Sequence, residues 1–301
     1  MTSTAWLRRS SPTAARARES RERERGPVMG EEAVPVITFL SDYGPWDGFV
    51  GVCHAVMARR APRARIIDLG HGVARHDVRA GALALRAALP YAPAGVHLAV
   101  VDPGVGGKRR AVALRVAAEG RTMVGPDNGL LTLAAQELGG VVEAVDIGES
   151  AECLRPVSAT FHGRDVFAPV AAALADGVAL ATLGEPIAVG ELVVLHLPSA
   201  RSDGNSLIAH VLTTDIYGNV SLDASAELAA AAGLHAGAAL LVEVAVTPTK
   251  GRFARTFADV APGELLAYID ARGALALAVN GGSAAAALAV GVDDELVLRA
   301  A

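Results

Sequence analysis

The sequence predicts an α/β domain with a parallel sheet, followed by a smaller domain of short β-strands. In the first part of the chain, apolar runs at Val34–Leu40, Arg65–Leu69 and His97–Val101 alternate with helical segments, which is typical of βαβ units. From about Leu192 the pattern changes to short alternating runs with turn signals, which indicates a small β-barrel or sandwich. A chain of 301 residues with 52% hydrophobic residues can form two such cores.

The other elements follow from the same periodicity. In the first domain we expect helices at about Asp47–Arg59, Asp77–Leu89, Leu130–Glu137 and Val166–Leu174, and further strands at Ala111–Val116, Arg121–Val124 and Val141–Ile147. In the second domain we expect strands at Ser206–Thr214, Asn219–Leu222, Ala239–Val246, Leu265–Ile269, Ala274–Val279 and Glu295–Arg299. Residues 198–205 (PSARSDGN) are expected to be the linker or its first turn.

These patterns divide the chain into three segments. Residues 1–33 are rich in Arg, Ser, Glu and Pro without apolar periodicity, and we expect a disordered extension. It lacks the long apolar core of a secretory signal, and Met29 is an alternative start. The α/β domain is expected over residues 34–195 and the β-domain over residues 200–301.

Charge and composition exclude several classes of function. The net charge of −5 argues against general nucleic-acid binding, which needs a basic surface. No apolar run reaches the roughly 18 to 20 residues needed to cross a bilayer. The two cysteines, Cys53 and Cys153, make neither a disulfide framework nor a zinc signature, and they fit a cytoplasmic protein.

Charged groups gather where the expected strands of the α/β domain end. Asp42 follows the first strand in SDYG, and Asp102 follows the third in DPGVGGKRR, whose glycines lead to Arg109. His162 precedes a helix in TFHGRD. Ligands of open α/β sheets bind at the carboxyl ends of the strands, so these are candidate site residues. The structural alternatives are a helix cap for Asp42 or His162 and a strand-ending turn for Asp102.

Other polar residues are given structural roles or none. In the GPDNG turn, Asp127 or Asn128 is expected to cap the helix that follows. The remaining histidines considered have no polar neighbours in the sequence, and we assign no role to His54, His97, His196, His210 or His235.

Four segments together resemble one enzyme family. They are SDYG at 41–44, DPGVGGKRR at 102–110, TFHGRD at 160–165 and TDIYGN at 214–219. Their order and spacing resemble the S-adenosyl-L-methionine (SAM) hydrolases, or SAM hydroxide adenosyltransferases, which are homologous to the fluorinase and chlorinase. The resemblance runs from about Val36 to Arg299. It implies a Rossmann-like N-terminal α/β domain, a C-terminal β-barrel and the conversion of SAM and water to adenosine and L-methionine.

The resemblance also implies an assembly and a set of site residues. The family forms homotrimers in which SAM lies between the N-terminal domain of one subunit and the C-terminal domain of the next. A catalytic set falls on Asp102, Arg109 and His162. The implied substrate contacts are Asp42 for the ribose hydroxyls, Asp215 for the methionine amine, Asn219 for adenine, Phe161, Tyr217 and Phe257 as aromatic contacts, and Arg272 near the methionine carboxylate. Ala271 stands where the family has a serine, which puts one methionine contact in doubt.

These residue types suit the implied chemistry. Methionine leaves the sulfonium of SAM as a neutral thioether, so the reaction needs no acid for the leaving group and no metal or other cofactor. It needs a positioned water and a group that takes its proton. Asp102 and His162 can each accept a hydrogen bond from that water, and Arg109 would keep Asp102 ionised. The sequence leaves open which of the two is the base, and whether water or hydroxide attacks.

Two other functions remain as alternatives. A SAM-dependent halogenase is disfavoured, because a carboxylate at Asp102 would repel a halide. The fluorinase-like relatives also have aromatic residues at the positions of Asp102 and His162, and a long insertion for which residues 117–120 leave no room. A SAM- or adenosine-binding sensor with negligible turnover would keep the substrate contacts. A generic nucleotide-binding Rossmann protein does not explain why Asp, Arg and His all stand at element ends.

Overall fold

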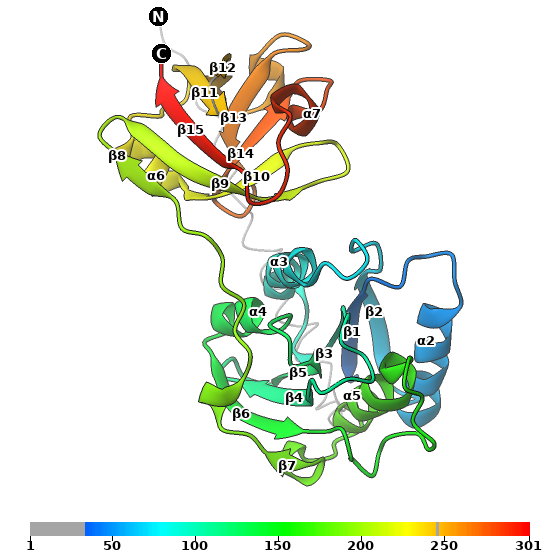
Figure 1. Ribbon diagram of the computed structural model, residues 1–301. Helices are drawn as coiled ribbons and strands as arrows, with labels where there is room; N and C mark the ends of the chain where they lie inside the picture. Colours follow the sequence, from blue (N-terminus) through cyan, green and yellow to red (C-terminus); the bar gives the residue numbers. More distant parts are fainter. Residues whose placement is uncertain (1–33, 245–246) are drawn as a thin grey trace, which may run out of the picture.

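The computed structural model describes residues 34–244 and 247–301, which form two lobes with one sheet each (Figure 1). The expected extension, residues 1–33, lies outside the described residues. The first sheet has the strand order β2-β1-β3-β5-β4-β6-β7. Its strands are β1 (Val36–Ser41), β2 (Arg65–Gly70), β3 (Gly95–Val100), β4 (Ala111–Val116), β5 (Arg121–Pro126), β6 (Val141–Asp146) and β7 (Glu185–Pro186).

The first sheet is mixed, which corrects the expectation of a parallel sheet. Strands β2, β1, β3 and β5 run parallel, whereas β4 is antiparallel to both of its neighbours, β5 and β6. Only residues 117–120 connect β4 to β5, and so short a connection can make a hairpin but not a crossover. Gly120 takes the positive φ of 67° that this turn needs.

Helices cover both faces of the first sheet (Figure 1). One face packs against α2 (Phe49–Arg60) and α5 (Ala168–Ala175), and the other against α3 (Val78–Ala88) and α4 (Thr132–Glu137). Strand β3 shows why both faces are apolar. Leu98 and Val100 enter the core beside α2 and α5, while Ala99 and Val101 enter the core beside α3 and α4. Strand ends therefore lie at an edge between two helical layers.

Two buried polar groups in this lobe differ from expectation. The sequence indicates no role for His97. In the structure its Nδ1 lies 2.9 Å from Thr38 Oγ1 and its Nε2 lies 3.0 Å from Arg121 Nη1. Burial, with the Arg121 charge adding to it, lowers the pKa of His97 to about 4. Asp127 was expected as one of two possible helix caps, but its Oδ2 accepts a hydrogen bond from Arg110 Nε at 2.9 Å instead. Both groups bridge elements that are distant in the sequence.

The second lobe is a closed β-barrel, which decides between the expected barrel and sandwich. Seven strands follow the order β10-β14-β13-β12-β11-β15-β9, and pairing of β10 with β9 closes the ring. The strands are β9 (Ser206–Thr214), β10 (Val220–Ser225), β11 (Ala239–Val244), β12 (Thr247–Phe253), β13 (Leu265–Ile269), β14 (Ala274–Val279) and β15 (Glu295–Ala300). The inward residues, such as Leu207, Ala209 and Val211 of β9, build one apolar core.

Some elements of the barrel lobe were not predicted. Strand β12 has the sequence TPTKGRF, which lacks apolar alternation, and its place is set by backbone pairing with β11 and β13. Strand β8 (Arg201–Asp203) lies in the segment expected to be a linker. Short helices α6 (Ala226–Ala231) and α7 (Ala284–Leu288) begin at capping Ser225 and Ser283. A single 3₁₀ turn spans Phe257–Asp259 in the barrel lobe, and the first lobe has three more, at Leu89–Tyr91, Leu180–Thr182 and Val189–Glu191.

The two lobes touch along α3. Leu195 and Leu197 pack with the core of the first lobe, whereas Ala200 packs with the barrel core, and we place the division between them. Leu212 of β9 also packs into the first lobe. Arg79 of α3 forms an ion pair with Asp293 of the barrel lobe. Across the described ranges, no helix combines the length and the apolar character needed to span a membrane.

Candidate functional site

Asp102, Arg109 and His162 form one bonded set just beyond the end of β3. Arg109 donates from Nε to Asp102 Oδ1 at 2.8 Å and from Nη2 to Asp102 Oδ2, which makes a two-point ion pair. Its Nη2 also lies 2.8 Å from His162 Nδ1. The side chains of Asp102 and Arg109 are 6% and 11% exposed. Shielding from water strengthens such a charge-assisted pair.

Glycines bring the two halves of this set together. Gly106 has a φ of 73°, and a Cβ added there would lie 2.1 Å from the carbonyl oxygen of Ala159. The turn after Asp102 therefore rests directly on the backbone just before His162. A side chain at Gly106 would push these two segments apart. The glycine-rich sequence is thus a packing requirement of the set, as well as a turn signal.

The His162 segment is held by its own contacts. Residues Gly163–Phe167 form a single π-helical turn that leads into α5, and such turns occur frequently at functional sites. Asp165 accepts hydrogen bonds from the Ser158 backbone N–H at 2.8 Å and from Arg164 Nε at 2.6 Å. The His162 side chain makes no capping bond to this turn, so the capping alternative is wrong.

The hydrogen bond to Arg109 defines the proton positions on His162. A guanidinium has only donors, so Nδ1 of His162 is the acceptor, and the proton of the neutral imidazole is on Nε2. Burial lowers the pKa of His162, the Arg109 charge lowers it further, and Asp102 and Asp165 oppose the shift. His162 is therefore a neutral imidazole at neutral pH, with its Nε2–H available to another oxygen.

Three aromatic rings lie beside the set. Tyr43, Phe49 and Phe161 pack edge-to-face or tilted, with ring centroids 5.1 to 5.8 Å apart. A Cβ added at Gly163 would lie 1.9 Å from the Tyr43 hydroxyl, so Tyr43 packs onto the turn that carries His162. Burial raises the pKa of Tyr43, with Cys53 and the carboxylates of Asp42 and Asp102 adding to the shift. Tyr43 stays a neutral phenol.

Asp42 lies at the same edge of the sheet as Asp102. The strands before them are neighbours, with Ser41 paired to Val100, and the Asp42 N–H donates to the Val100 carbonyl at 3.3 Å. Asp42 Oδ2 accepts the His76 N–H at 2.9 Å. Helix α2 has Gly48 at its N-cap position and no side-chain cap, so the alternative that Asp42 caps this helix is wrong.

In the barrel lobe, Asp215 organises the loop between β9 and β10. Its Oδ1 accepts the backbone N–H groups of Tyr217 and Asn219, each at 2.9 Å, and its Oδ2 accepts Asn219 Nδ2 at 2.8 Å. Gly218 lets this loop pack closely against Ser283, because a Cβ added at Gly218 would lie 2.0 Å from Ser283 Oγ. The loop leaves Tyr217 72% exposed, so its ring is presented to solvent within one chain.

Arg272 and Phe257 both lie near Tyr268. Arg272 donates to Asp270 Oδ2 from Nε at 3.0 Å and to Ser221 Oγ from Nη2 at 3.1 Å. The rings of Phe257 and Tyr268 are 5.3 Å apart. Burial raises the pKa of Tyr268, the Asp215 and Asp270 carboxylates add to the shift, and the Arg272 charge opposes it.

Sequence reasoning missed Tyr43, Tyr268 and Asp270. The two tyrosines were detectable in part, because aromatics make up only 4% of the chain, Tyr43 is part of SDYG and Tyr268 stands four residues before Arg272. Asp270 stands two residues before Arg272, at a spacing that suits a local ion pair. Their positions against the site depend on strand pairing that no local pattern reports.

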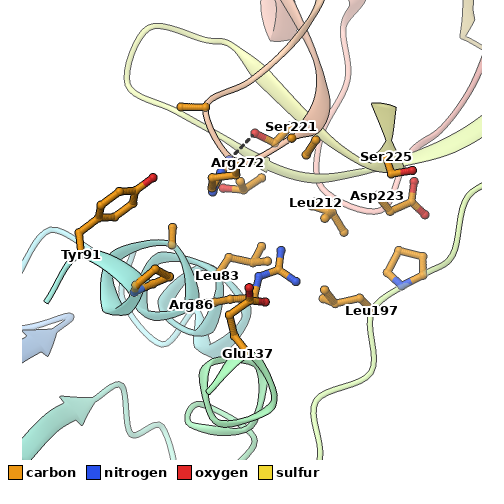
Figure 2. Close-up of a pocket in the computed structure, with 17 residues that line it drawn as sticks. Leu83, Arg86, Tyr91, Glu137, Leu197, Leu212, Ser221, Asp223, Ser225 and Arg272 are labelled. Atoms are coloured by element: carbon orange, nitrogen blue, oxygen red, sulfur yellow. Dashed lines mark hydrogen bonds between the residues drawn. The ribbon is translucent and has the colours of Figure 1, made fainter. Parts of the chain in front are cut away.

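The two groups of candidate residues lie in different lobes of one chain, and the cavities that their members line are separate. A cavity of about 530 Å³ separates α3 from the barrel, where Arg272 and Ser221 face Leu83 and Tyr91 (Figure 2). Another cavity, of about 540 Å³, is lined by Arg109 and His162 on the first lobe. The structure thus brings Asp102, Arg109, His162, Asp42 and Phe161 together in one lobe. It gathers Asp215, Tyr217, Asn219, Phe257 and Arg272 in the other lobe, without joining the two groups.

Comparison with known proteins places these residues in a family. Residues 37–184 match the family description SAM hydroxide adenosyltransferase N-terminal domain, and residues 209–297 match the corresponding C-terminal domain. A protein of Salinispora tropica named (R)-S-adenosyl-L-methionine hydrolase is 49% identical over 88% of this chain and 98% of its own length. A protein of the same name from Thermus thermophilus is 44% identical over 84% of this chain and 94% of its own.

A solved structure and a more distant relative are also similar to this chain over most of its length. The crystal structure of an uncharacterized conserved protein from Thermotoga maritima has a TM-score of 0.81 and 37% identity, covering 87% of this chain and 99% of its own. A fluorinase from Nocardia brasiliensis is 30% identical over 83% of this chain and 92% of its own length. The expected Rossmann-like and barrel architecture is therefore confirmed in the fold of a relative.

The electrostatics of His162 can be measured directly. We expect its imidazole to protonate below its ordinary pKa of 6.5, as followed by long-range ¹H–¹⁵N NMR spectra, with His162→Gln identifying the signal. Arg109→Gln should raise that pKa, because it removes a repelling charge and leaves Asp102. Lys108→Gln, a neighbouring charge change outside the set, should leave it unchanged. An equal pKa in the wild type and Arg109→Gln would contradict the described contact.

Proposed function

Because the chain belongs to the SAM hydroxide adenosyltransferase family, we propose that it hydrolyses S-adenosyl-L-methionine to adenosine and L-methionine. The observation that carries the proposal is the bonded set of Asp102, Arg109 and His162 at the carboxyl edge of the sheet. Relatives at 49% and 44% identity have the name of that activity. The reaction consumes SAM as substrate and uses no cofactor.

The proposed reaction is an in-line substitution at C5′ of the ribose. An oxygen nucleophile forms the new C5′–O bond as the C5′–S bond breaks, and the bond pair leaves with sulfur as the neutral thioether of methionine. Water as the nucleophile releases one proton in total. Holding the nucleophile and C5′ in line can remove about 7 to 11 kcal/mol from the entropic part of the activation barrier.

The hydrogen bonds support hydroxide as the attacking species. His162 Nδ1 accepts from Arg109, so His162 directs an N–H, rather than a lone pair, toward a nucleophile. Asp102 already receives two hydrogen bonds from Arg109. A water beside the Arg109 charge loses its proton more readily, because a nearby opposite charge favours the ionised form. In this proposal Arg109 and His162 hold hydroxide, and Asp102 holds Arg109 in place.

We propose the substrate contacts in the positions that the family resemblance implies. Asp42 accepts from the ribose hydroxyls, and Asp215 accepts from the methionine amine. Asp215 retains this capacity although it holds its own loop, since a carboxylate has about four acceptor positions. Asn219 would bind adenine between the rings of Tyr217 and Phe257, with Phe161 on the side of the first lobe. Tyr217 and Phe257 are 72% and 40% exposed, which supports the proposal that both rings are accessible to adenine.

Arg272 is the weakest of these assignments. Asp270 and Ser221 already bind its guanidinium, so the side chain serves the methionine carboxylate only through its remaining donors. Ala271 provides no hydroxyl next to it. We propose that the backbone N–H of Ala271 supplies the missing contact, because the N–H groups of residues 272–274 already donate to Asp270.

We propose a homotrimer with each site shared between two subunits. One chain keeps the Asp102 set and the Asp215 loop in separate lobes, without a common cavity among those described. Trp46 in the first lobe and Ile216 in the barrel lobe are both 93% exposed, next to their respective candidate motifs. In the proposed assembly these two side chains would become buried at the contact between subunits. A neighbouring barrel would cover Trp46 and complete the SAM site.

Halogenation is the alternative function, and two features oppose it. Asp102 is a buried carboxylate whose charge would repel a halide, although Arg109 offsets part of it. The hairpin between β4 and β5 has no insertion. A SAM- or adenosine-binding sensor with negligible turnover is the non-enzymatic alternative.

The products distinguish these functions. Purified protein is incubated with SAM in ¹⁸O-water that contains chloride, and products are analysed by mass spectrometry. We expect adenosine with ¹⁸O at the 5′ position, because the nucleophile comes from water. A 5′-chloro product would assign the chain to the halogenases, and SAM binding without any product would support the sensor.

Removal of the Asp102 carboxylate tests the role of the bonded set. In Asp102→Ala we expect kcat to fall by about 10²-fold or more, because Arg109 and His162 lose the group that positions them. SAM affinity should stay within roughly tenfold, because the proposed substrate contacts are elsewhere. Asp176→Ala, which removes an exposed partner of Arg60, is the matched control and should keep full turnover. Full turnover in Asp102→Ala would contradict the proposal.

Mixed oligomers test whether the site is shared. Asp102→Ala and Asp215→Ala damage different lobes, and each variant alone should be inactive. After co-refolding in equal amounts, roughly a quarter of the sites should combine two intact lobes if neighbouring subunits build each site. Sites built within one chain would regain nothing. Light scattering of the wild type should give the mass of a trimer, and a fully active monomer would contradict the assembly.

A further inference from the structure

A second cluster of polar side chains lies away from the Asp102 set. His54 of α2 meets Asp68 of β2 and His71, which follows β2 by one residue. One donor atom from each lies within 4.8 Å of the other two. Asp68 Oδ1 is 2.8 Å from His54 Nε2 and 3.0 Å from His71 Nε2. Strand β2 is the edge strand of the first sheet, so the cluster lies at the surface.

His71 has a buried nitrogen that the protein does not satisfy. Its Nδ1 is bonded to Ser41 Oγ at 2.8 Å, while Nε2 is buried without a hydrogen-bond partner among the described residues. The 3.0 Å approach to Asp68 lacks the geometry of a hydrogen bond. If Nδ1 carries the proton, the lone pair of Nε2 points toward a carboxylate. A cation between them would remove this repulsion and satisfy the nitrogen.

The side chains of the cluster are held in position before any ligand binds. The buried ring of Phe39 lies 4.7 Å from the ring of His71 and 6.1 Å from that of His54, beneath both. Ser41 holds the far nitrogen of His71, which is how second-shell partners orient metal-binding histidines. The side chains of His54 and Asp68 are 34% and 41% exposed, which leaves an open side for water.

We propose that His54, Asp68 and His71 bind a divalent transition cation of the Zn²⁺ class. Two imidazoles and a carboxylate form a three-ligand set that zinc uses with water as the fourth ligand. Bonds of about 2.0 to 2.2 Å in a tetrahedral arrangement separate ligand atoms by roughly 3.3 Å. Asp68 Oδ1 would therefore move away from His54 Nε2 by about 0.5 Å and from His71 Nε2 by about 0.3 Å, and the two imidazole nitrogens, which lie within 4.8 Å of each other, would adjust their separation. The proposal is independent of the hydrolase activity and assigns the ion no catalytic step.

The site is connected to the SDYG motif. His71 accepts the Gly44 N–H through its carbonyl oxygen at 2.7 Å, and its ring binds Ser41. Ser41 and Gly44, at the two ends of the loop that carries Asp42, are thus both hydrogen-bonded to His71. A bound ion would restrict His71, and through it this loop. The ion would stabilise the folded chain without contacting the candidate substrate residues.

Metal binding is tested on the full chain, freed of any purification tag and treated with chelator. Co²⁺ is titrated first, because its visible absorption reports a site with nitrogen and oxygen ligands. Zn²⁺ is then measured by competition with a chromophoric chelator and by the shift in Tm. We expect one equivalent per chain and a Tm that rises with Zn²⁺ concentration, since an ion that binds only the folded state stabilises it.

Variants separate this cluster from other histidines. His54→Gln should weaken Zn²⁺ binding at least tenfold and abolish the Co²⁺ band, while its circular dichroism stays that of the wild type. His210→Gln is the matched control, because His210 also lies beside two carboxylates, Asp223 and Glu295, at 2.8 and 3.6 Å. It should keep wild-type binding. No Co²⁺ band in the wild type, or equal Zn²⁺ affinity in the wild type and His54→Gln, would overturn the proposal.

Discussion

The guanidinium of Arg109 is the contact on which the site depends. It bonds both oxygens of Asp102 and the Nδ1 of His162, and so connects two segments that are 53 residues apart in the chain. A carboxylate as buried as that of Asp102 is costly unless a charge pairs with it. Burial lowers the pKa of His162, the Arg109 charge lowers it further, and the bond to Nδ1 leaves the proton of the neutral ring on Nε2. One side chain therefore holds Asp102 and His162 together and fixes the tautomer of His162.

The backbone around this contact is built for close approach. Gly106 meets the Ala159 carbonyl, and Gly163 meets the Tyr43 hydroxyl, at distances that leave no space for a side chain. Three sequence motifs thereby become one surface. The same edge of the sheet carries Asp42, because β1 and β3 are neighbours that run in the same direction. Neighbouring parallel strands explain why two carboxylates 60 positions apart in the chain lie at one edge of the sheet.

The barrel lobe has a different part in the molecule. Its candidate residues are in loops between strands, held by local bonds such as those of Asp215 and Asp270. Rigid loops that present exposed rings suit the binding of a flat base, since little conformational freedom remains to be lost. The separation of these loops from the Asp102 set within one chain makes assembly part of the proposed function. The His54 cluster lies apart from both groups, on the edge strand β2.

The sequence by itself determined most strands, the helical layers and the motifs, because apolar periodicity reports which side of an element is buried. Strand β12 escaped prediction because backbone pairing, not side-chain pattern, places it. The motifs also identified the family. Only the tertiary structure showed that Asp127 pairs with Arg110, that His97 bridges Thr38 and Arg121, and that His54 meets Asp68 and His71. Such contacts join side chains that are distant in the sequence, so they exist only once the sheet has brought their strands and helices together.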